Sequence, residues 1–193
     1  MSGQFGIGSD LGGRMDGIDV ARYGLRAVVG GTMIAHGLRH GRTLDGTTQW
    51  FRSVGFRGAR LQAAASAAVE VGAGAALLAG VATPLAASAV VGTMGVAARS
   101  VHLPHGFFVT DEGYEYVLNL GAAAVALAAL GPGRLSVDRA LGIDGRLGGR
   151  RGAAFAAGFG LAAAAVQLGA CWRRPRPGTA DADPADGPAR TRE

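Results

Sequence analysis

The sequence contains no lysine and only one cysteine, Cys171, among its 193 residues. Because one thiol cannot form a disulfide within the chain, thiol redox chemistry would need a partner's cysteine or a cofactor. The sequence also lacks a Ser/His/Asp arrangement, a CxxC pair, a Walker loop and a glycine-rich dinucleotide loop. These absences argue against the soluble hydrolases, thiol oxidoreductases and nucleotide-binding enzymes that such motifs identify.

Charged residues amount to 17% of the chain, and they avoid several long apolar stretches. The stretches 61–80 and 153–172 are each twenty residues long, which matches the hydrocarbon thickness of a bilayer. Polar residues do not recur along them at the interval of a soluble helical bundle. We therefore predict an all-α membrane protein, with a four-helix transmembrane bundle over 20–140 and a fifth transmembrane helix over 153–172. The four spans of the bundle are expected at 20–38, 61–80, 84–98 and 114–130.

The remaining segments are expected to lie outside the bilayer. Residues 1–19 form a flexible N-terminal tail rather than a signal peptide, because no apolar region follows a basic start. Residues 141–152 form a basic linker, and the Pro- and Asp-rich residues 173–193 form a disordered tail. Residues 39–60 hold five arginines and three large aromatics, which indicates an interfacial stretch.

Local signals place several helix ends and contacts. Thr83 is the predicted N-cap of the third span, with Pro84 at its first helical position. Ser136 is the predicted cap of a short surface helix. Arg22 and Arg26 are expected to extend toward lipid headgroups. Glycines 30 and 31 are expected to let a neighbouring helix approach closely.

The pI near 10.6 comes from arginine alone. The arginines lie in short runs between apolar stretches, where they meet anionic headgroups, so we predict a lipid bilayer and no nucleic acid as partner. Their numbers on the two sides are too similar to assign the orientation of the chain in the membrane.

Alternation of the spans predicts a polar cluster on one membrane face, called side B here; side A is the face with the N-terminus. Glu70 lies near the middle of its span, where an ionisable residue usually faces the protein interior. The alternative is a protonated carboxyl group that bonds to Ser66 as a structural link. The predicted cluster consists of His36, Glu70, Arg99, His102, His105, Glu115 and Asn119. His40, Asp111 and Glu112 are expected at the same membrane face.

The segment 102–116 concentrates histidines, carboxylates and aromatics. The pairs His36/His40 and His102/His105 have spacings that metal ligands use, but no strict metal motif is present, so no metal is predicted. The aromatics of this segment form either an interfacial belt or the walls of a quinone pocket with proton-handling groups nearby. The cofactor therefore stays open, with quinone as a candidate.

Several short motifs together resemble the DoxX family. They are Ala35-His36-Gly37, Glu70 followed by Gly72 and Gly74, His102-Leu-Pro-His-Gly-Phe-Phe, Gly113-Tyr-Glu-Tyr, and Gly131-Pro-Gly-Arg-Leu-Ser-Val-Asp138. The resemblance covers about residues 20–140. His105 departs from the pattern, which usually has Asn there, and the fifth apolar helix is an addition to the four-helix core of the family.

The resemblance implies a multi-pass protein of the bacterial inner membrane. It also implies a scaffold or subunit of a membrane-associated redox and thiol-stress complex, with soluble oxidoreductase or sulfurtransferase partners. The related DoxD proteins imply the alternative of a quinone-linked oxidoreductase subunit. A small-solute carrier with Glu70 as a proton site, and a homo-oligomeric state, remain open. Enzymatic activity and catalytic residues are not assigned by any of these patterns.

Overall fold

The computed structural model describes residues 15–144 and 148–175, and within these ranges the chain is helical with no strand. The all-α prediction is confirmed. The α-helices are α1 (Gly17–Arg42), α2 (Leu44–Ser53), α3 (Ala59–Ala79), α4 (Thr83–Ala97), α5 (Glu115–Leu130), α6 (Val137–Ala140) and α7 (Gly149–Cys171). Three short helical turns, η1 (Ala98–His102), η2 (Leu103–His105) and η3 (Val109–Asp111), connect α4 to α5.

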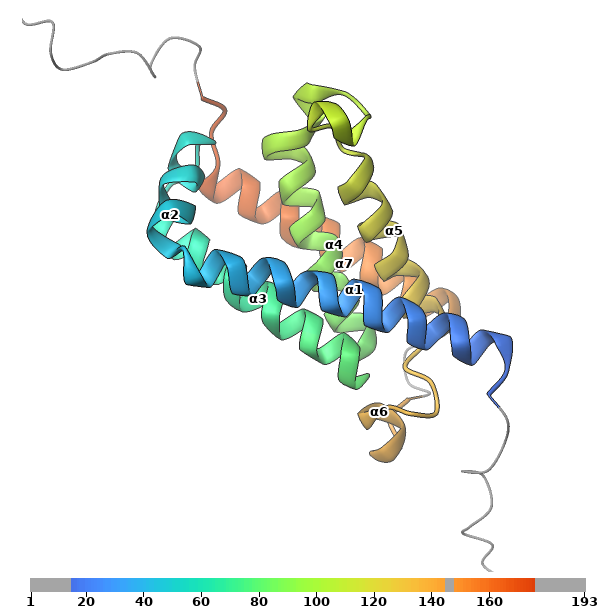
Figure 1. The fold of residues 1–193 in the computed structure, drawn as a ribbon. Helices are drawn as coiled ribbons and strands as arrows, with labels where there is room; N and C mark the ends of the chain where they lie inside the picture. The colour runs from blue at the N-terminus through green and yellow to red at the C-terminus, as the bar shows by residue number, and fades with distance from the viewer. Residues whose placement is uncertain (1–14, 145–147, 176–193) are drawn as a thin grey trace, which may run out of the picture.

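Two groups of helices build the bundle (Figure 1). Helix α1 packs along α3, and α4 packs against both α5 and α7. Helix α2 lies beside the start of α3, whereas the turns η1–η3 form a loop at the same end of the molecule. The two groups diverge toward this end, which corresponds to side B.

Helix boundaries differ from the predicted spans mainly at α1 and at the start of α7, which begins four residues before the predicted span and includes the end of the predicted linker. Helix α1 begins three residues before the predicted start and ends four residues after the predicted end. Its start is set by Asp16, whose side chain accepts a hydrogen bond from the backbone N–H of Asp19. The predicted interfacial stretch contains helix α2, which the pattern of aromatics and arginines did not predict. The predicted tails fall largely on residues 1–14 and 176–193, which lie outside the described ranges.

Small residues allow α1 and α3 to pack closely. A methyl group added at Gly30 would lie 2.8 Å from the carbonyl oxygen of Gly74, whereas one added at Gly31 would have no atom within 4 Å. The predicted close approach is therefore correct for Gly30 and wrong for Gly31. On the other side of the bundle, a methyl group at Gly160 of α7 would lie 2.6 Å from the carbonyl oxygen of Ser88 in α4.

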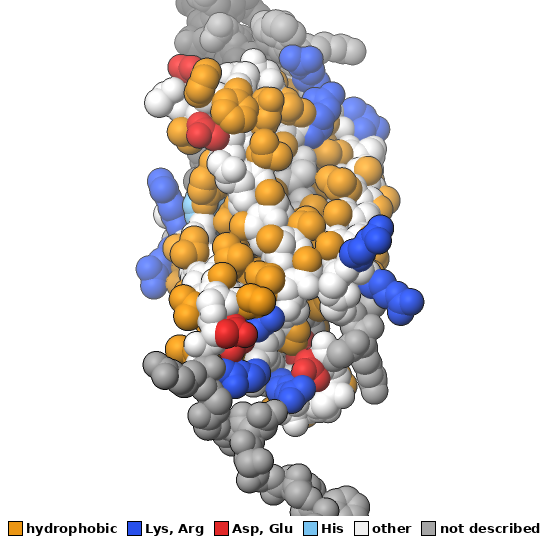
Figure 2. Space-filling view, turned by 90° about the vertical axis from the view of Figure 1, so that its right-hand side faces the viewer, with side chains coloured by type: hydrophobic (Ala, Val, Ile, Leu, Met, Phe, Trp, Pro, Cys, Tyr) orange, Lys and Arg blue, Asp and Glu red, His pale blue; other side chains and the backbone are white. Residues whose placement is uncertain are grey.

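The chain is a membrane protein by the length and composition of its helices. Helix α3, the continuous helical stretch 83–105 and α7 are each long and apolar enough to cross a bilayer, while α5 is apolar but shorter. Helix α1 falls outside that group because polar and charged side chains interrupt its apolar face. Hydrophobic side chains cover the middle of the face in Figure 2, with charged side chains around its margins.

Side A is closed by a buried arginine, which corrects the expectation that Arg26 extends toward headgroups. Arg26 is only 5% exposed. Its guanidinium donates hydrogen bonds to the carbonyl oxygens of Leu77 (2.9 Å), Pro132 (2.8 Å) and Leu135 (2.7 Å) and also to that of Leu78. The last carbonyls of a helix lack partners within it, so the end of α3 offers acceptors that hold the side chain inside.

The start of α4 is capped from a distance rather than by Thr83, so the predicted N-cap is wrong. The N-cap is Ala82, and Thr83 is the first helical residue. The buried carboxylate of Asp138 accepts hydrogen bonds from the backbone N–H groups of Ala82 (2.8 Å) and Thr83 (3.2 Å). The other cap is confirmed, because Ser136 accepts a hydrogen bond from the N–H of Arg139 at the start of α6.

At side B, a strap of backbone contacts joins the α2–α3 turn to the end of α7. The N–H of Arg57 donates to the carbonyl oxygen of Cys171 (2.7 Å), and the N–H of Arg173 donates to that of Gly55 (3.0 Å). The indole N–H of Trp172 donates to the carbonyl oxygen of Val54 (2.7 Å). Helix α7 is therefore fixed to the bundle at the end where α1, α3, α4 and α5 diverge.

Candidate functional site

A cavity of about 510 Å³ occupies the space between the diverging helices. Its lining comes from α1, α2, α3, α4, α5 and α7, and most of the lining is apolar. Met33, Phe51, Phe56, Met94 and Leu120 supply large apolar surfaces. Cavities of this size and lining, with a few convergent polar groups, are typical small-molecule sites.

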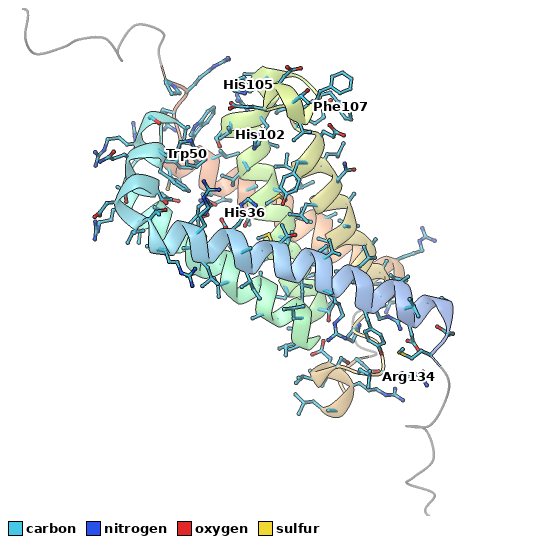
Figure 3. The ribbon with its side chains drawn as sticks, viewed as in Figure 1. His36, Trp50, His102, His105, Phe107 and Arg134 are labelled. Carbon is cyan, nitrogen blue, oxygen red and sulfur yellow. The ribbon has the colours of Figure 1, made fainter. Side chains whose placement is uncertain are left out.

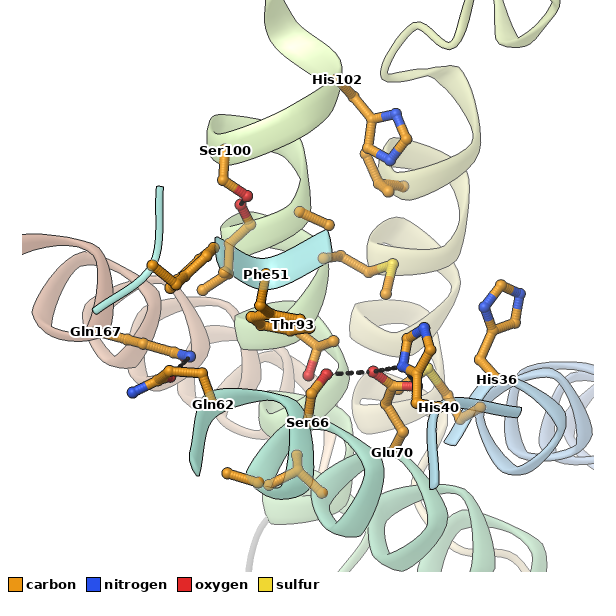
Figure 4. Close-up of a pocket in the computed structure, with 18 of the residues that line it drawn as sticks. His36, His40, Phe51, Gln62, Ser66, Glu70, Thr93, Ser100, His102 and Gln167 are labelled. Atoms are coloured by element: carbon orange, nitrogen blue, oxygen red, sulfur yellow. Dashed lines mark hydrogen bonds and ion pairs between the residues drawn. The ribbon is translucent and has the colours of Figure 1, made fainter. Parts of the chain in front are cut away.

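The central polar group of the cavity is a chain of three side chains (Figure 4). Glu70 is 3% exposed. Its Oε1 accepts a hydrogen bond from the Ser66 hydroxyl at 2.5 Å. The Nδ1 of His40 lies 3.2 Å from Oε1 and 3.1 Å from Oε2. One ring N–H can point well at only one oxygen, and the geometry favours Oε1, which leaves Oε2 buried without a hydrogen-bond partner.

This arrangement fixes the orientation of His40. With Nδ1 directed at the carboxylate, Nε2 is the ring atom left for a ligand. A carboxylate in contact with one ring nitrogen of an imidazole holds the ring in one orientation. Helix α1 brings His40 to this position and α3 brings Glu70, because Gly30 and Gly74 let the two helices pack closely.

The rim of the cavity carries further aromatic and histidine side chains. His36 stacks on Tyr116 with ring centroids 6.2 Å apart, so that the ring contact joins α1 to α5 across the opening. His102 Nδ1 donates to the carbonyl oxygen of Glu112 at 2.6 Å. Since a carbonyl only accepts, Nδ1 of His102 carries a hydrogen, and its Nε2 is an acceptor when the ring is neutral.

A pair of glutamine amides forms the other polar feature of the cavity. The Nε2 of Gln167 in α7 donates to the Oε1 of Gln62 in α3 at 2.8 Å. Both side chains line the cavity, at the opposite end of its α3 wall from Glu70. The pair connects α3 directly to α7.

Of the predicted polar cluster, His36, Glu70 and His102 line the cavity, and four residues do not. Arg99 lies outside, with its guanidinium 4.8 Å from the ring centroid of Trp172. Glu115 accepts a hydrogen bond from the N–H of Val109 and so holds the connecting loop. His105 and Asn119 are exposed. In Figure 3, His102 and His105 lie at the loop end of the bundle, and only His102 is in the cavity lining.

The proposed cluster omitted polar residues that the structure places in the cavity lining. They are Gln62, Ser66, Thr93, Ser100, Tyr116 and Gln167, together with His40, which was expected at the same membrane face. The sequence did contain a signal, which corrects the statement that polar residues do not recur along 61–80. Gln62, Ser66 and Glu70 follow one another every four residues in that span and therefore share one helix face. Gln167 had no comparable signal, since its neighbours in α7 are all apolar.

The cavity is large enough for a small apolar molecule, and His40 in its lining is a residue type that can exchange protons. Within the described residues, no three His, Cys, Asp or Glu side chains lie close enough together to hold a metal ion. Arg26 and Arg99 contact other groups, and His40 is the basic side chain in contact with Glu70.

A family model described as DoxX matches residues 21–103, which confirms the resemblance over α1 to η2. Helices α5, α6 and α7 lie outside the matched range. No curated protein and no solved structure matches the chain.

Proposed function

We propose that the chain is a plasma-membrane subunit of a redox complex and that it binds a quinone in its interhelical cavity. The match of residues 21–103 to the DoxX model and the apolar helices support the membrane location. The observation that carries the proposal is the His40–Glu70–Ser66 chain in a largely apolar cavity of about 510 Å³. Cavities of roughly 300 to 1,000 Å³ hold small ring compounds, and the volume of this cavity lies within that range.

The polar groups fit the chemistry of a quinone ring. Reduction of a quinone to its hydroquinol takes up two electrons and two protons, and the protons go to the ring oxygens. His40 presents Nε2 to such an oxygen, either as a donor when protonated or as an acceptor when neutral. Glu70 acts on the ligand through His40, because the contact at Nδ1 holds the imidazole in one orientation. The electrons come from a soluble oxidoreductase partner, which the complex supplies.

A titration with duroquinone, a tetramethyl-1,4-benzoquinone, tests the proposal in detergent-solubilised protein. Trp50 lines the cavity, so a ring bound there should quench its fluorescence with a saturable dependence on concentration. The variant Trp50→Phe should lose most of the quenching. It retains Trp172 as an internal reference.

Matched histidine variants assign the binding to the cavity. His40→Ala should weaken duroquinone binding by roughly tenfold, since a hydrogen bond to a charged donor is worth about 1.5 kcal/mol or more. His105→Ala is the control and should change nothing, because His105 is exposed outside the cavity lining. Equal effects of the two substitutions, or no saturable quenching, would refute the proposal.

A scaffold role is the second candidate, and the observation that favours it is the loop between α4 and α5. Leu103, Phe107, Phe108 and Val109 are each between 43% and 63% exposed there. Such an apolar tip can dock a soluble partner at the membrane surface. A double Phe107→Ser, Phe108→Ser variant should lose co-purifying soluble oxidoreductases while it keeps duroquinone binding; retention of those partners would reject the docking role of the loop.

A further inference from the structure

The amide pair formed by Gln62 and Gln167 has hydrogen-bonding capacity beyond the bond that joins the two side chains. Each glutamine amide offers two N–H donors and an oxygen acceptor. One bond of 2.8 Å joins Gln167 Nε2 to Gln62 Oε1. Within the described residues, no other hydrogen bond reaches the Nε2 of Gln62 or the Oε1 of Gln167. The pair therefore leaves one amide nitrogen and one amide oxygen available at the cavity wall.

This conclusion does not depend on how the two amides are turned. If both amides were rotated by 180°, Gln62 would donate to Gln167, and the pair would still leave one amide nitrogen and one amide oxygen unused. A ligand group that both donates and accepts fits such a pair best. A hydroxyl group does so, whereas a carbonyl oxygen only accepts.

The pair is also at a suitable distance from His40 and Glu70. Gln62 and Glu70 are eight residues apart on α3, a rise of about 12 Å along the helix. A six-membered ring with oxygens at opposite positions measures roughly 5 Å between those oxygens. A hydrogen bond of about 2.8 Å at each end extends the span to about 11 Å. The separation of the two polar ends along α3 is therefore similar to the length of one ring with a hydrogen bond at each end, and Ser66 lies between them (Figure 4).

Helix α7 supplies Gln167 from outside the matched DoxX range. The strap at Trp172 fixes the end of α7 five residues beyond Gln167, and α7 packs along α4. Its position is therefore set by the fold and not by the amide bond alone.

We propose that Gln62 and Gln167 bind the second ring oxygen of the ligand, an inference that rests on the proposed quinone-binding function. The two amides would make the cavity bind the hydroquinol more tightly than the quinone. The hydroxyl of a hydroquinol donates to the Oε1 of Gln167 and accepts from the Nε2 of Gln62. A quinone oxygen accepts from Gln62 but leaves the Oε1 of Gln167 facing it without a donor, which is unfavourable away from water.

Competition binding measures this selectivity in the full chain. Durohydroquinol is titrated against bound duroquinone, and its affinity is read from the recovery of Trp50 fluorescence. The unsubstituted chain should bind the hydroquinol about tenfold more tightly than the quinone. Gln167→Met and Gln62→Met keep the side-chain length and should bring the ratio of the two dissociation constants to about one. Gln49→Met is the control, since Gln49 is exposed on α2 outside the cavity lining, and it should keep the ratio.

A ligand-side measurement keeps the inference testable if either glutamine variant folds poorly. The dimethyl ether of durohydroquinol has the same ring but no hydroxyl donor, so the unsubstituted chain should bind it about tenfold less tightly than the hydroquinol. An unchanged ratio in both variants, or equal affinity for ether and hydroquinol, would overturn the inference while duroquinone binding remains. Absence of duroquinone binding to the unsubstituted chain would instead reject the proposed function itself.

Discussion

The substitution Arg26→Met tests whether the buried guanidinium holds side A together. Methionine replaces the apolar part of the arginine stem but removes every donor. Three hydrogen bonds of ordinary length, to the carbonyls of Leu77, Pro132 and Leu135, are lost together with the contact to Leu78. These bonds tie α1 to the end of α3 and to the segment after α5.

The expected cost follows from those contacts. A hydrogen bond from a charged donor contributes about 1.5 to 3 kcal/mol. Removal of the buried charge also removes its desolvation penalty, which offsets part of the loss. We therefore expect Arg26→Met to lower the free energy of unfolding by about 3 to 5 kcal/mol. The free energy of unfolding of Arg26→Lys should lie between those of Arg26→Met and the unsubstituted chain. An ammonium group retains the charge but cannot reach carbonyls spread as widely as these.

Unfolding by sodium dodecyl sulfate in mixed micelles, followed by far-ultraviolet circular dichroism, measures this change. Arg60→Met is the matched control, because the Arg60 side chain is 70% exposed and that of its partner Asp45 is 86% exposed. Such a pair contributes less than about 1 kcal/mol. If Arg26→Met stayed within about 1 kcal/mol of the unsubstituted chain, Arg26 would be a headgroup contact after all.

Two further substitutions test helix packing and capping. Gly30→Ala should lower the free energy of unfolding by about 1 to 3 kcal/mol because its methyl group meets the carbonyl oxygen of Gly74; Gly31→Ala, one residue away, should be neutral or stabilising by up to about 1 kcal/mol. Asp138→Ala should cost about 1 to 2 kcal/mol by removing the cap of α4, and the same titration measures it. Equal effects at the two glycines, or no loss at Asp138, would count against the packing and capping described above.

The sequence predicted the helices well, because long apolar stretches indicate membrane spans. Helices α3, α4, α5 and α7 lie largely within the spans predicted for them. Contacts that depend on distant partners were less predictable. The cap at Ala82 depends on Asp138, which is 56 residues away in the chain, so the local signal at Thr83 was misleading. Arg26 resembled a headgroup contact because its acceptors, such as Leu77, are backbone carbonyls, which every residue carries.

The polar cluster was predicted from alternation of the spans, and alternation fixes which end a residue occupies. It does not fix the rotation of a helix about its axis. Asn119 therefore falls on an exposed face of α5, while Tyr116 of the same helix lines the cavity. The partnership of His40 with Glu70 required the register between α1 and α3, which the close contact at Gly30 determines.

Photolabelling tests most directly whether the interhelical cavity binds a quinone ring. An azido derivative of duroquinone is irradiated with the full chain in detergent, and labelled peptides are identified by mass spectrometry. The account predicts labels on cavity-lining residues such as Trp50, Met94 and Tyr116, and their loss with excess duroquinone. Labels confined to exposed apolar residues outside the cavity, such as Leu161 and Val166, and insensitive to excess duroquinone, would contradict it.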